Sequence, residues 1–80
     1  MSAPESRPLL FTPLTIRGVT LPNRVVISPM VQYHAKDGFA NDFHVVHLGG
    51  FARGRAGLVF SEGTAVEARG RVTELDTGIW

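Results

Sequence analysis

Arg24-Val25-Val26-Ile27-Ser28 is a short, almost continuous apolar run, and Gly57-Leu58-Val59-Phe60-Ser61-Glu62 repeats its pattern later in the chain. Both runs contain β-branched residues, and neither alternates apolar with polar positions. Such runs are typical of strands that are buried on both faces, as in parallel sheets. Pro29 ends the first run and Gly63-Thr64 ends the second, so the sequence predicts two short buried strands.

The segment between these two strands predicts a helix. Asn41 is a suitable N-cap residue, and Asp42 is favourably placed in the first turn. The residues that then recur at helical spacing are Phe43, Val46, His47, Gly50 and Phe51. Gly54 is a natural C-terminal stop, which gives a helix over about residues 42–53. A strand, a crossover helix and a second strand form one βαβ unit with parallel strands.

The remaining segments predict connections and one hairpin. Leu14-Thr15-Ile16 and Val19-Thr20-Leu21 are β-prone runs, and the turn between them contains Gly18, which can take positive φ. We expect a loop over residues 30–40 and a polar loop over residues 64–80. Residues 1–8 are expected to be a flexible lead-in. Because one βαβ unit cannot cover both faces of its sheet, residues 9–80 are expected to be the opening piece of a larger α/β domain.

Composition excludes several classes of function. The chain has 80 residues with 44% hydrophobic and 19% charged residues, which is globular composition for at most one small domain. Cysteine is absent, which excludes a thiolate metal site and fits a cytoplasmic protein. The formal net charge of +1 comes from scattered residues, so we expect no nucleic-acid partner. No apolar stretch approaches the roughly 20 residues that cross a bilayer, and no secretory signal is evident, so we expect no membrane partner.

An ordered set of short motifs resembles the start of the old yellow enzyme family of FMN-dependent NAD(P)H oxidoreductases. The motifs are Leu10-Phe11-Thr12-Pro13-Leu14, Leu21-Pro22-Asn23-Arg24-Val25-Val26-Ile27-Ser28-Pro29-Met30, Asp37-Gly38, Phe43-His44-Val45-Val46-His47, Gly57-Leu58-Val59-Phe60-Ser61-Glu62, Gly70-Arg71-Val72-Thr73 and Gly78-Ile79-Trp80. The subgroup that they resemble most is the bacterial short-form, thermophilic-like ene-reductases. The fold implied is the N-terminal portion of a (β/α)8 TIM barrel, with a capping hairpin, strand 1, helix 1 and strand 2.

The resemblance also implies an activity and its cofactors. NADH or NADPH would reduce FMN, which would then reduce an activated, enone-like alkene. No catalytic residue and no metal ligand is expected within these 80 residues, since the family's substrate-holding pair lies further along. A homo-oligomer of the full-length protein is also compatible with the resemblance.

Six site residues follow from the resemblance. The cofactor-binding residues implied are Ser28, Pro29, Met30, Val31 and Gly63. Tyr33 is implied to bind the substrate by a hydrogen bond to a carbonyl oxygen. Val31 departs from the family pattern, in which many relatives have cysteine or threonine. Valine keeps the backbone amide but has no side-chain donor, which leaves the subgroup and the substrate open.

Four other polar residues are of types that often serve in functional sites. His44 and His47 are three residues apart on the predicted helix, but no acidic or thiol partner lies at ligand spacing, so we expect packing or capping rather than metal binding. Glu62 is expected to be a structural partner rather than a general base. Arg71 either approaches the pocket or forms a salt bridge with Glu74.

Other functional readings remain beside the flavoenzyme. The chain could be an inactive truncated product with unpaired strand edges, or a small interaction module derived from such a barrel. Within the enzyme class, a dienoyl-reductase-like protein or a hydroxylase-associated flavin domain is also compatible with Val31.

Overall fold

A computed structural model describes residues 7–80 of the chain, so most of the predicted lead-in lies outside the described residues. The elements in chain order are η1 (Leu9–Phe11), β1 (Leu14–Ile16), β2 (Val19–Leu21), β3 (Val26–Ile27), α2 (Asp42–Arg53), β4 (Leu58–Val59), β5 (Thr64–Ala65), η2 (Ala68–Gly70) and β6 (Thr77–Gly78). Among residues 7–80, no helix has the length and apolar character that a bilayer crossing requires.

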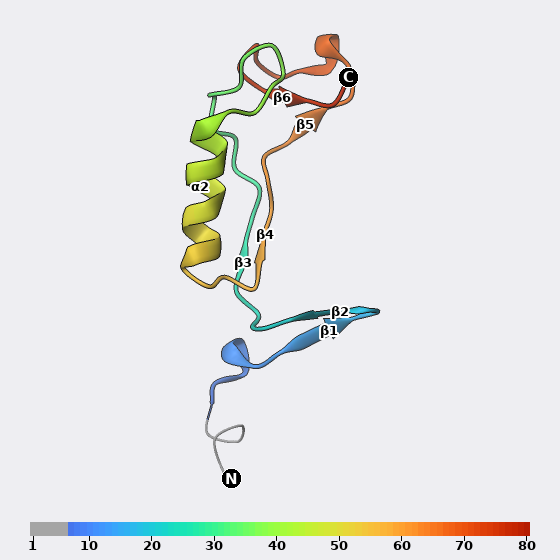
Figure 1. Cartoon of the computed structure of the whole chain (residues 1–80). Helices are drawn as coiled ribbons and strands as arrows, with labels where there is room; N and C mark the ends of the chain where they lie inside the picture. The colour runs from blue at the N-terminus through green and yellow to red at the C-terminus, as the bar shows by residue number, and fades with distance from the viewer. Residues whose placement is uncertain (1–6) are drawn as a thin grey trace.

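The predicted βαβ unit is present. β3 and β4 pair in parallel, with Val26 opposite Leu58 and Ile27 opposite Val59. Both strands are shorter than predicted, but backbone hydrogen bonds extend the pairing, since Val25 accepts from Gly57 and Leu58 and Ile27 accepts from Phe60. α2 lies along one side of this strand pair, as Figure 1 shows.

α2 begins and ends where the sequence predicts. The Asn41 side chain accepts the N–H of Phe43 at 3.0 Å, and the backbone N–H of Asn41 donates to His44 Nδ1 at 3.0 Å. These reciprocal bonds form a capping box, which satisfies two N–H groups at the start of the helix. Gly54 is the C-cap and donates back into the last turn.

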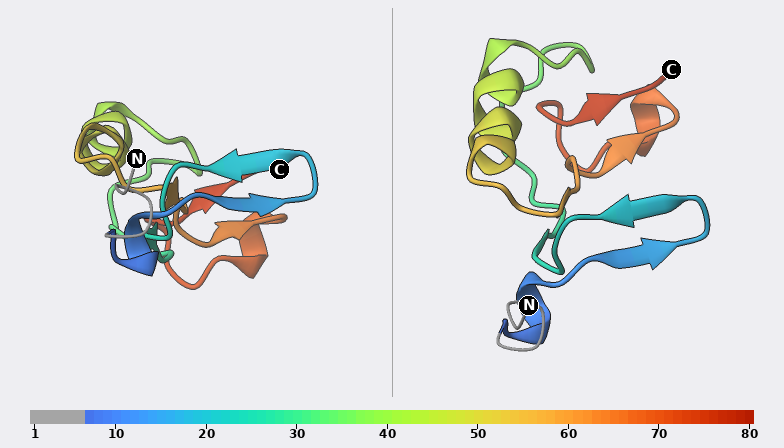
Figure 2. Two further views of the ribbon diagram at one scale, coloured as in Figure 1. Left: turned by 90° about the horizontal axis from the view of Figure 1, so that it is seen from below. Right: turned by 60° about the horizontal axis from the view of Figure 1, so that its bottom comes forward.

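The predicted hairpin is also present. β1 and β2 pair antiparallel, with Thr15 opposite Thr20, and the two hydroxyls are 2.9 Å apart. The prediction that Gly18 takes the positive φ is wrong, because Arg17 takes it, with φ of 53°. Figures 1 and 2 show the hairpin at the amino ends of β3 and β4, away from α2.

The prediction of a polar loop over residues 64–80 is wrong. β5 and β6 pair in parallel, with Thr64 opposite Thr77, and η2 lies between them in the chain. A second contact supports this arrangement, because Gly78 donates its N–H to the carbonyl of Gly38 at 2.9 Å. Strands of two residues leave no periodic pattern in the sequence. The contact of β6 with Gly38 also joins residues that are far apart in the chain.

The described residues form an open arrangement of one helix against a strand pair rather than a closed core. The radius of gyration is 16.4 Å, whereas a compact domain of this length would have about 12 Å. Within residues 7–80, Leu21 and Ala35 are the buried apolar side chains. Val26 and Phe60 are about half exposed, so the strands are not buried on both faces as predicted. α2 covers one face only, and the other face is open.

Asp76 organises the segment before β6. Its carboxylate accepts the N–H of Val72 at 2.9 Å and of Thr73 at 3.1 Å, and also the Thr73 hydroxyl at 2.9 Å. The Thr73 hydroxyl in turn accepts the N–H of Leu75 at 3.1 Å. The hydrogen bonds from Thr73 lower the pKa of Asp76 below its usual 3.8, with help from Val72 and the charge of Arg71.

A depressed carboxyl pKa predicts a pH dependence of known sign. The Asp76 contacts stabilise the 71–76 turn fully above the unfolded pKa of 3.8, and this stabilisation is lost as the pH falls through the folded value. In the complete protein, Asp76→Asn should raise amide exchange at Val72 and Thr73 at neutral pH, because both N–H groups donate to one carboxylate oxygen and a neutral amide oxygen is a weaker acceptor. Asp42→Asn, an exposed change on α2, serves as the control. Equal exchange in the two variants would contradict this role.

Candidate functional site

A cavity lies where the chain leaves the carboxyl ends of β3 and β4. Its volume is about 310 Å³. The lining residues are Val31, Tyr33, Gly63, Thr64, Ala65, Gly70, Val72 and Asp76. We call it the upper cavity. Parallel strands bring the loops at their carboxyl ends to one edge of the sheet, which is where ligands bind in (β/α)8 barrels. Three of the six predicted site residues, Val31, Tyr33 and Gly63, therefore meet at one cavity.

Val31 and Gly63 both line the upper cavity, and their backbone N–H groups are available as donors. Within residues 7–80, the N–H groups of both residues have no hydrogen-bond acceptor. Gly63 has ordinary negative φ or extended backbone, and a Cβ built on it would meet no atom within 4 Å. Nothing within the described chain therefore requires glycine at this position, and the space in front of it is open.

Tyr33 projects from the loop after β3 with an unusual backbone. Its φ is 58°, in the left-handed region that bulky residues rarely adopt. The residue is 52% exposed and lines the upper cavity, so it is accessible to a ligand there. Such a conformation persists only where the surroundings impose it.

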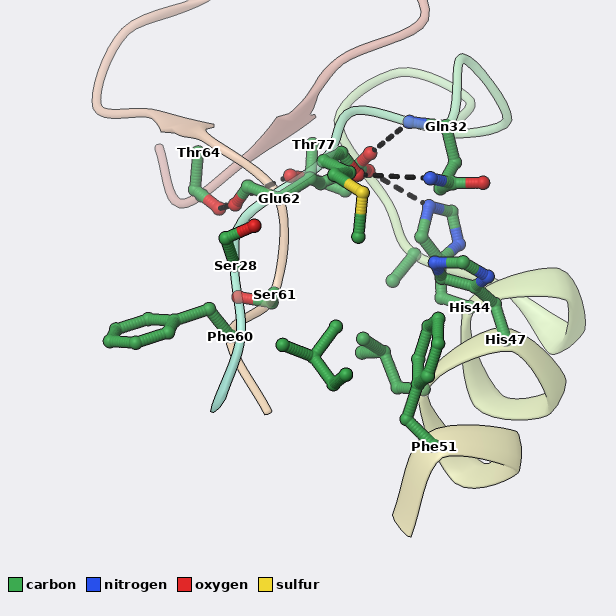
Figure 3. Close-up of a pocket in the computed structure, with 14 residues that line it drawn as sticks. Ser28, Gln32, His44, His47, Phe51, Phe60, Ser61, Glu62, Thr64 and Thr77 are labelled. Carbon is green, nitrogen blue, oxygen red and sulfur yellow. Dashed lines mark hydrogen bonds and ion pairs between the residues drawn. The ribbon is translucent and has the colours of Figure 1, made fainter. Parts of the chain in front are cut away.

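Ser28 and Met30 lie on a different cavity. This inner cavity, of about 160 Å³, lies between α2 and the strand pair, and its walls include Ile27, Leu48 and Phe51 (Figure 3). Its apolar walls are the facing sides of a helix and two strands, so most of it is the interior layer of the fold. Pro29 lines neither cavity. The predicted platform of residues 28–31 is thus divided between two surfaces.

Glu62 joins three elements at the top of the inner cavity. Its Oε1 accepts from His44 Nε2 at 3.0 Å, and its Oε2 accepts the N–H of Gln32 at 2.7 Å (Figure 3). Glu62 and His44 are each 7% exposed. Because the Asn41 N–H can only donate to His44 Nδ1, His44 Nε2 carries the hydrogen that points to Glu62. Glu62 is thus a structural partner.

The histidines of α2 cap and pack. Both ring nitrogens of His44 are engaged in hydrogen bonds, and the ring of His47 lies between those of Phe43 and Phe51, with centroids 5.8 and 5.1 Å away. Within residues 7–80 no group of three or more His, Asp or Glu side chains could hold a metal ion.

Arg71 does not pair with the carboxylate of Glu74. Its Nε donates to the carbonyl of Ala68 at 2.8 Å, and its Nη1 reaches the backbone carbonyl of Glu74 at 3.4 Å. The guanidinium lies 5.3 Å from the ring centroid of Trp80. Arg71 is also absent from the lining of the upper cavity, so of the two expectations for Arg71 neither describes its contacts.

Sequence reasoning missed the far wall of the upper cavity. Thr64, Val72 and Asp76 line it because β5 and β6 pair. A signal for Asp76 was present, since Thr73-Glu74-Leu75-Asp76 has the spacing of a capping box, and the structure contains one of its two bonds, from the Thr73 N–H to the Asp76 carboxylate, while the Thr73 hydroxyl accepts from Leu75 instead. No apolar helical pattern follows this motif, so it did not predict a helix start.

The upper cavity fits one edge of a flavin ring. The ring's carbonyl edge requires N–H donors, which Val31 and Gly63 offer, and the open space at Gly63 allows a flat ring to approach the backbone. The only charged side chain in the lining is Asp76. An anionic phosphate would therefore be held by residues outside this set.

Comparisons with known proteins identify the family. The sequence model of the NADH:flavin oxidoreductase / NADH oxidase family matches residues 9–80. The chain is 54% identical over 71 residues to NADH:flavin oxidoreductase FG08077 of Gibberella zeae, covering 89% of this chain and 17% of that protein. It is 49% identical over 73 residues to the NADPH dehydrogenase of Bacillus subtilis, covering 89% of this chain and 22% of that protein.

Solved structures agree with the sequence comparison. Morphinone reductase superposes with a TM-score of 0.79 at 35% identity, over 94% of this chain and 20% of that chain. The prediction of an N-terminal portion of a (β/α)8 barrel is confirmed, as is the resemblance to the old yellow enzyme family. The chain spans about a fifth of the length of these relatives. It belongs to the NADH:flavin oxidoreductase / NADH oxidase family.

Proposed function

We propose that the complete protein is an FMN-dependent oxidoreductase that takes reducing equivalents from NADH or NADPH and reduces an activated, enone-like alkene. The observation that carries the proposal is the convergence of Val31, Tyr33 and Gly63 on the upper cavity. The family membership of residues 9–80 and the names of the relatives support the flavin and the nicotinamide.

Each of these residues has a distinct part in the proposal. FMN, when bound, would supply the redox chemistry, and the protein would supply position and electrostatics. Val31 and Gly63 would donate their N–H groups to the polar edge of the ring. Ser28, Pro29 and Met30 would bind the cofactor as the segment that leads into Val31, although Ser28 and Met30 line the inner cavity and Pro29 lines neither cavity. Tyr33 would donate its hydroxyl to the carbonyl oxygen of the substrate.

The other readings receive less support. A small interaction module would need a closed core, but residues 7–80 bury two apolar side chains and leave one face of the strand pair open. The same openness supports the view that this stretch alone is inactive and needs the rest of a barrel. A dienoyl-reductase-like or hydroxylase-associated flavin domain would use the same cavity with a different substrate. A cytoplasmic location and a homo-oligomer belong to the proposal only by analogy with the family.

Gly63→Val should weaken FMN binding by the complete protein. The methyl groups of valine would occupy the space where the ring approaches the backbone. Overpacking of this kind costs about 1–3 kcal/mol, which is roughly a fivefold to hundredfold increase in Kd. Gly49→Val on α2 is the matched control, because a Cβ there also meets no atom within 4 Å. Equilibrium dialysis with FMN measures both variants. Equal Kd values for the two would remove Gly63 from the site.

Val31→Thr should raise the midpoint potential of the bound FMN by a few tens of millivolts. Reduced FMN carries more negative charge than oxidised FMN, and a hydrogen bond from the introduced hydroxyl would stabilise the reduced form by about 1.5–3 kcal/mol at most. For a two-electron couple, about 1.4 kcal/mol corresponds to roughly 30 mV. Val19→Thr, in the hairpin and 61% exposed, is the control. Spectroelectrochemistry gives the result. An unchanged or lower potential means that Val31 does not face the ring.

Tyr33→Phe should impair alkene reduction more than flavin retention. The complete protein is expected to oxidise NADPH in the presence of cyclohexenone under anaerobic conditions, with a KM for the enone that rises in the variant. The lost hydrogen bond to a carbonyl predicts a rise of roughly fivefold to tenfold. FMN content and the reductive half-reaction should stay at their wild-type values. An unchanged oxidative half-reaction across several enones would refute the role.

A further inference from the structure

We propose that Glu62, His44 and Asn41 form a clamp that sets the position of Tyr33 at the upper cavity. The inference rests on the proposed function, because it assigns positioning residues to the substrate-binding tyrosine. None of the three side chains lines the upper cavity, so they act through the loop that carries Tyr33.

The clamp holds the chain on both sides of Tyr33. On one side, the N–H of Gln32 donates to Glu62 Oε2 at 2.7 Å. On the other, Asn41 Nδ2 donates to the carbonyl of His34 at 2.7 Å. Tyr33 itself forms no hydrogen bond within residues 7–80, so its backbone is fixed through its two neighbours.

The backbone of Tyr33 requires such a restraint. Its φ of 58° is unfavourable for a residue with a Cβ and an aromatic ring, and an unrestrained tripeptide would leave this region. The two bonds to Gln32 and His34 oppose that relaxation. The ring of His34 also stacks on Phe43 of α2, with centroids 3.7 Å apart, which ties the same end of the tripeptide to the helix.

His44 connects Glu62, which holds Gln32, to Asn41, which holds His34. Its Nδ1 accepts the N–H of Asn41 at 3.0 Å, and its Nε2 donates to Glu62 Oε1 at 3.0 Å. The carboxylate and the imidazole are buried, and every buried side-chain nitrogen and oxygen among the described residues has a partner. The end of β4, the start of α2 and the loop after β3 are thereby joined in one chain of hydrogen bonds.

The direction of these bonds makes the clamp testable by exchange of chemical groups. In Glu62→Gln, one amide oxygen can accept from Gln32, but the NH2 group then faces the Nε2–H of His44. In His44→Glu, the cap on Asn41 is kept but two carboxylates face each other. The double variant restores a donor opposite an acceptor, because the amide introduced at position 62 can donate to the carboxylate introduced at position 44. In His44→Gln, the amide can accept from Asn41 and donate to Glu62, so both links are kept.

The experiment compares these variants in the complete protein loaded with FMN. Two readouts are measured, namely amide hydrogen exchange at Gln32, and kcat and KM for cyclohexenone. In Glu62→Gln and in His44→Glu, we expect faster exchange at the Gln32 amide, which is the amide bonded to Glu62, and a KM roughly tenfold higher, with FMN content unchanged. The double variant and His44→Gln should return both readouts toward wild type. Glu67→Gln, an exposed carboxylate paired with Arg69, is the matched control.

Three outcomes would overturn the clamp. The first is a Glu62→Gln protein that exchanges and turns over like Glu67→Gln. The second is a His44→Gln or double variant that is as impaired as His44→Glu, because a purely structural loss is not restored by a swap of donor and acceptor. The third is faster exchange with an unchanged KM while Tyr33→Phe raises the KM. If Tyr33→Phe has no effect on the enone, the proposed function of Tyr33 fails, and the exchange data alone decide the clamp.

Discussion

The rest of the structure depends on the parallel pairing of β3 with β4, which α2 connects as a crossover helix. Two facing residue pairs, Val26–Leu58 and Ile27–Val59, set the register. Because the strands are parallel, the loops that follow them leave the sheet at the same edge. Residues far apart in the chain, such as Val31 and Gly63, therefore line one cavity. The hairpin lies at the opposite end, where it leaves this edge free (Figure 1).

Polar contacts, rather than a large apolar core, hold the site edge together. The carboxylates of Glu62 and Asp76 are both buried. Glu62 accepts the N–H of Gln32 in the loop after β3, and Asp76 accepts the N–H groups of Val72 and Thr73 in its own turn. The β5–β6 pair is hydrogen-bonded to the turn at Gly38 through the N–H of Gly78. A carboxylate that organises backbone amides fixes loops at a position where apolar packing is scarce. The open face of the strand pair would be covered by further barrel units in the complete protein.

The sequence predicted the parts of this structure that carry a local signal. The capping residue Asn41 and the apolar spacing gave the bounds of α2, and the apolar runs located β3 and β4. The far wall of the cavity was not predictable, since β5 and β6 are two residues long and pair through distant contacts. The link from Glu62 to Gln32 was also hidden, because a backbone N–H leaves no mark in a sequence. The family resemblance, not the residue pattern, picked out Val31, Tyr33 and Gly63.

The most direct test of the account is a crystal structure of the complete protein with FMN bound. The central claim is that the loops after β3 and β4 form one wall of the flavin site. We expect the N–H groups of Val31 and Gly63 to lie at hydrogen-bond distance, about 2.7–3.2 Å, from the polar edge of the ring, with Gly63 facing the ring. A ring bound away from both amides, or amides that pair instead with other parts of the protein, would contradict the account.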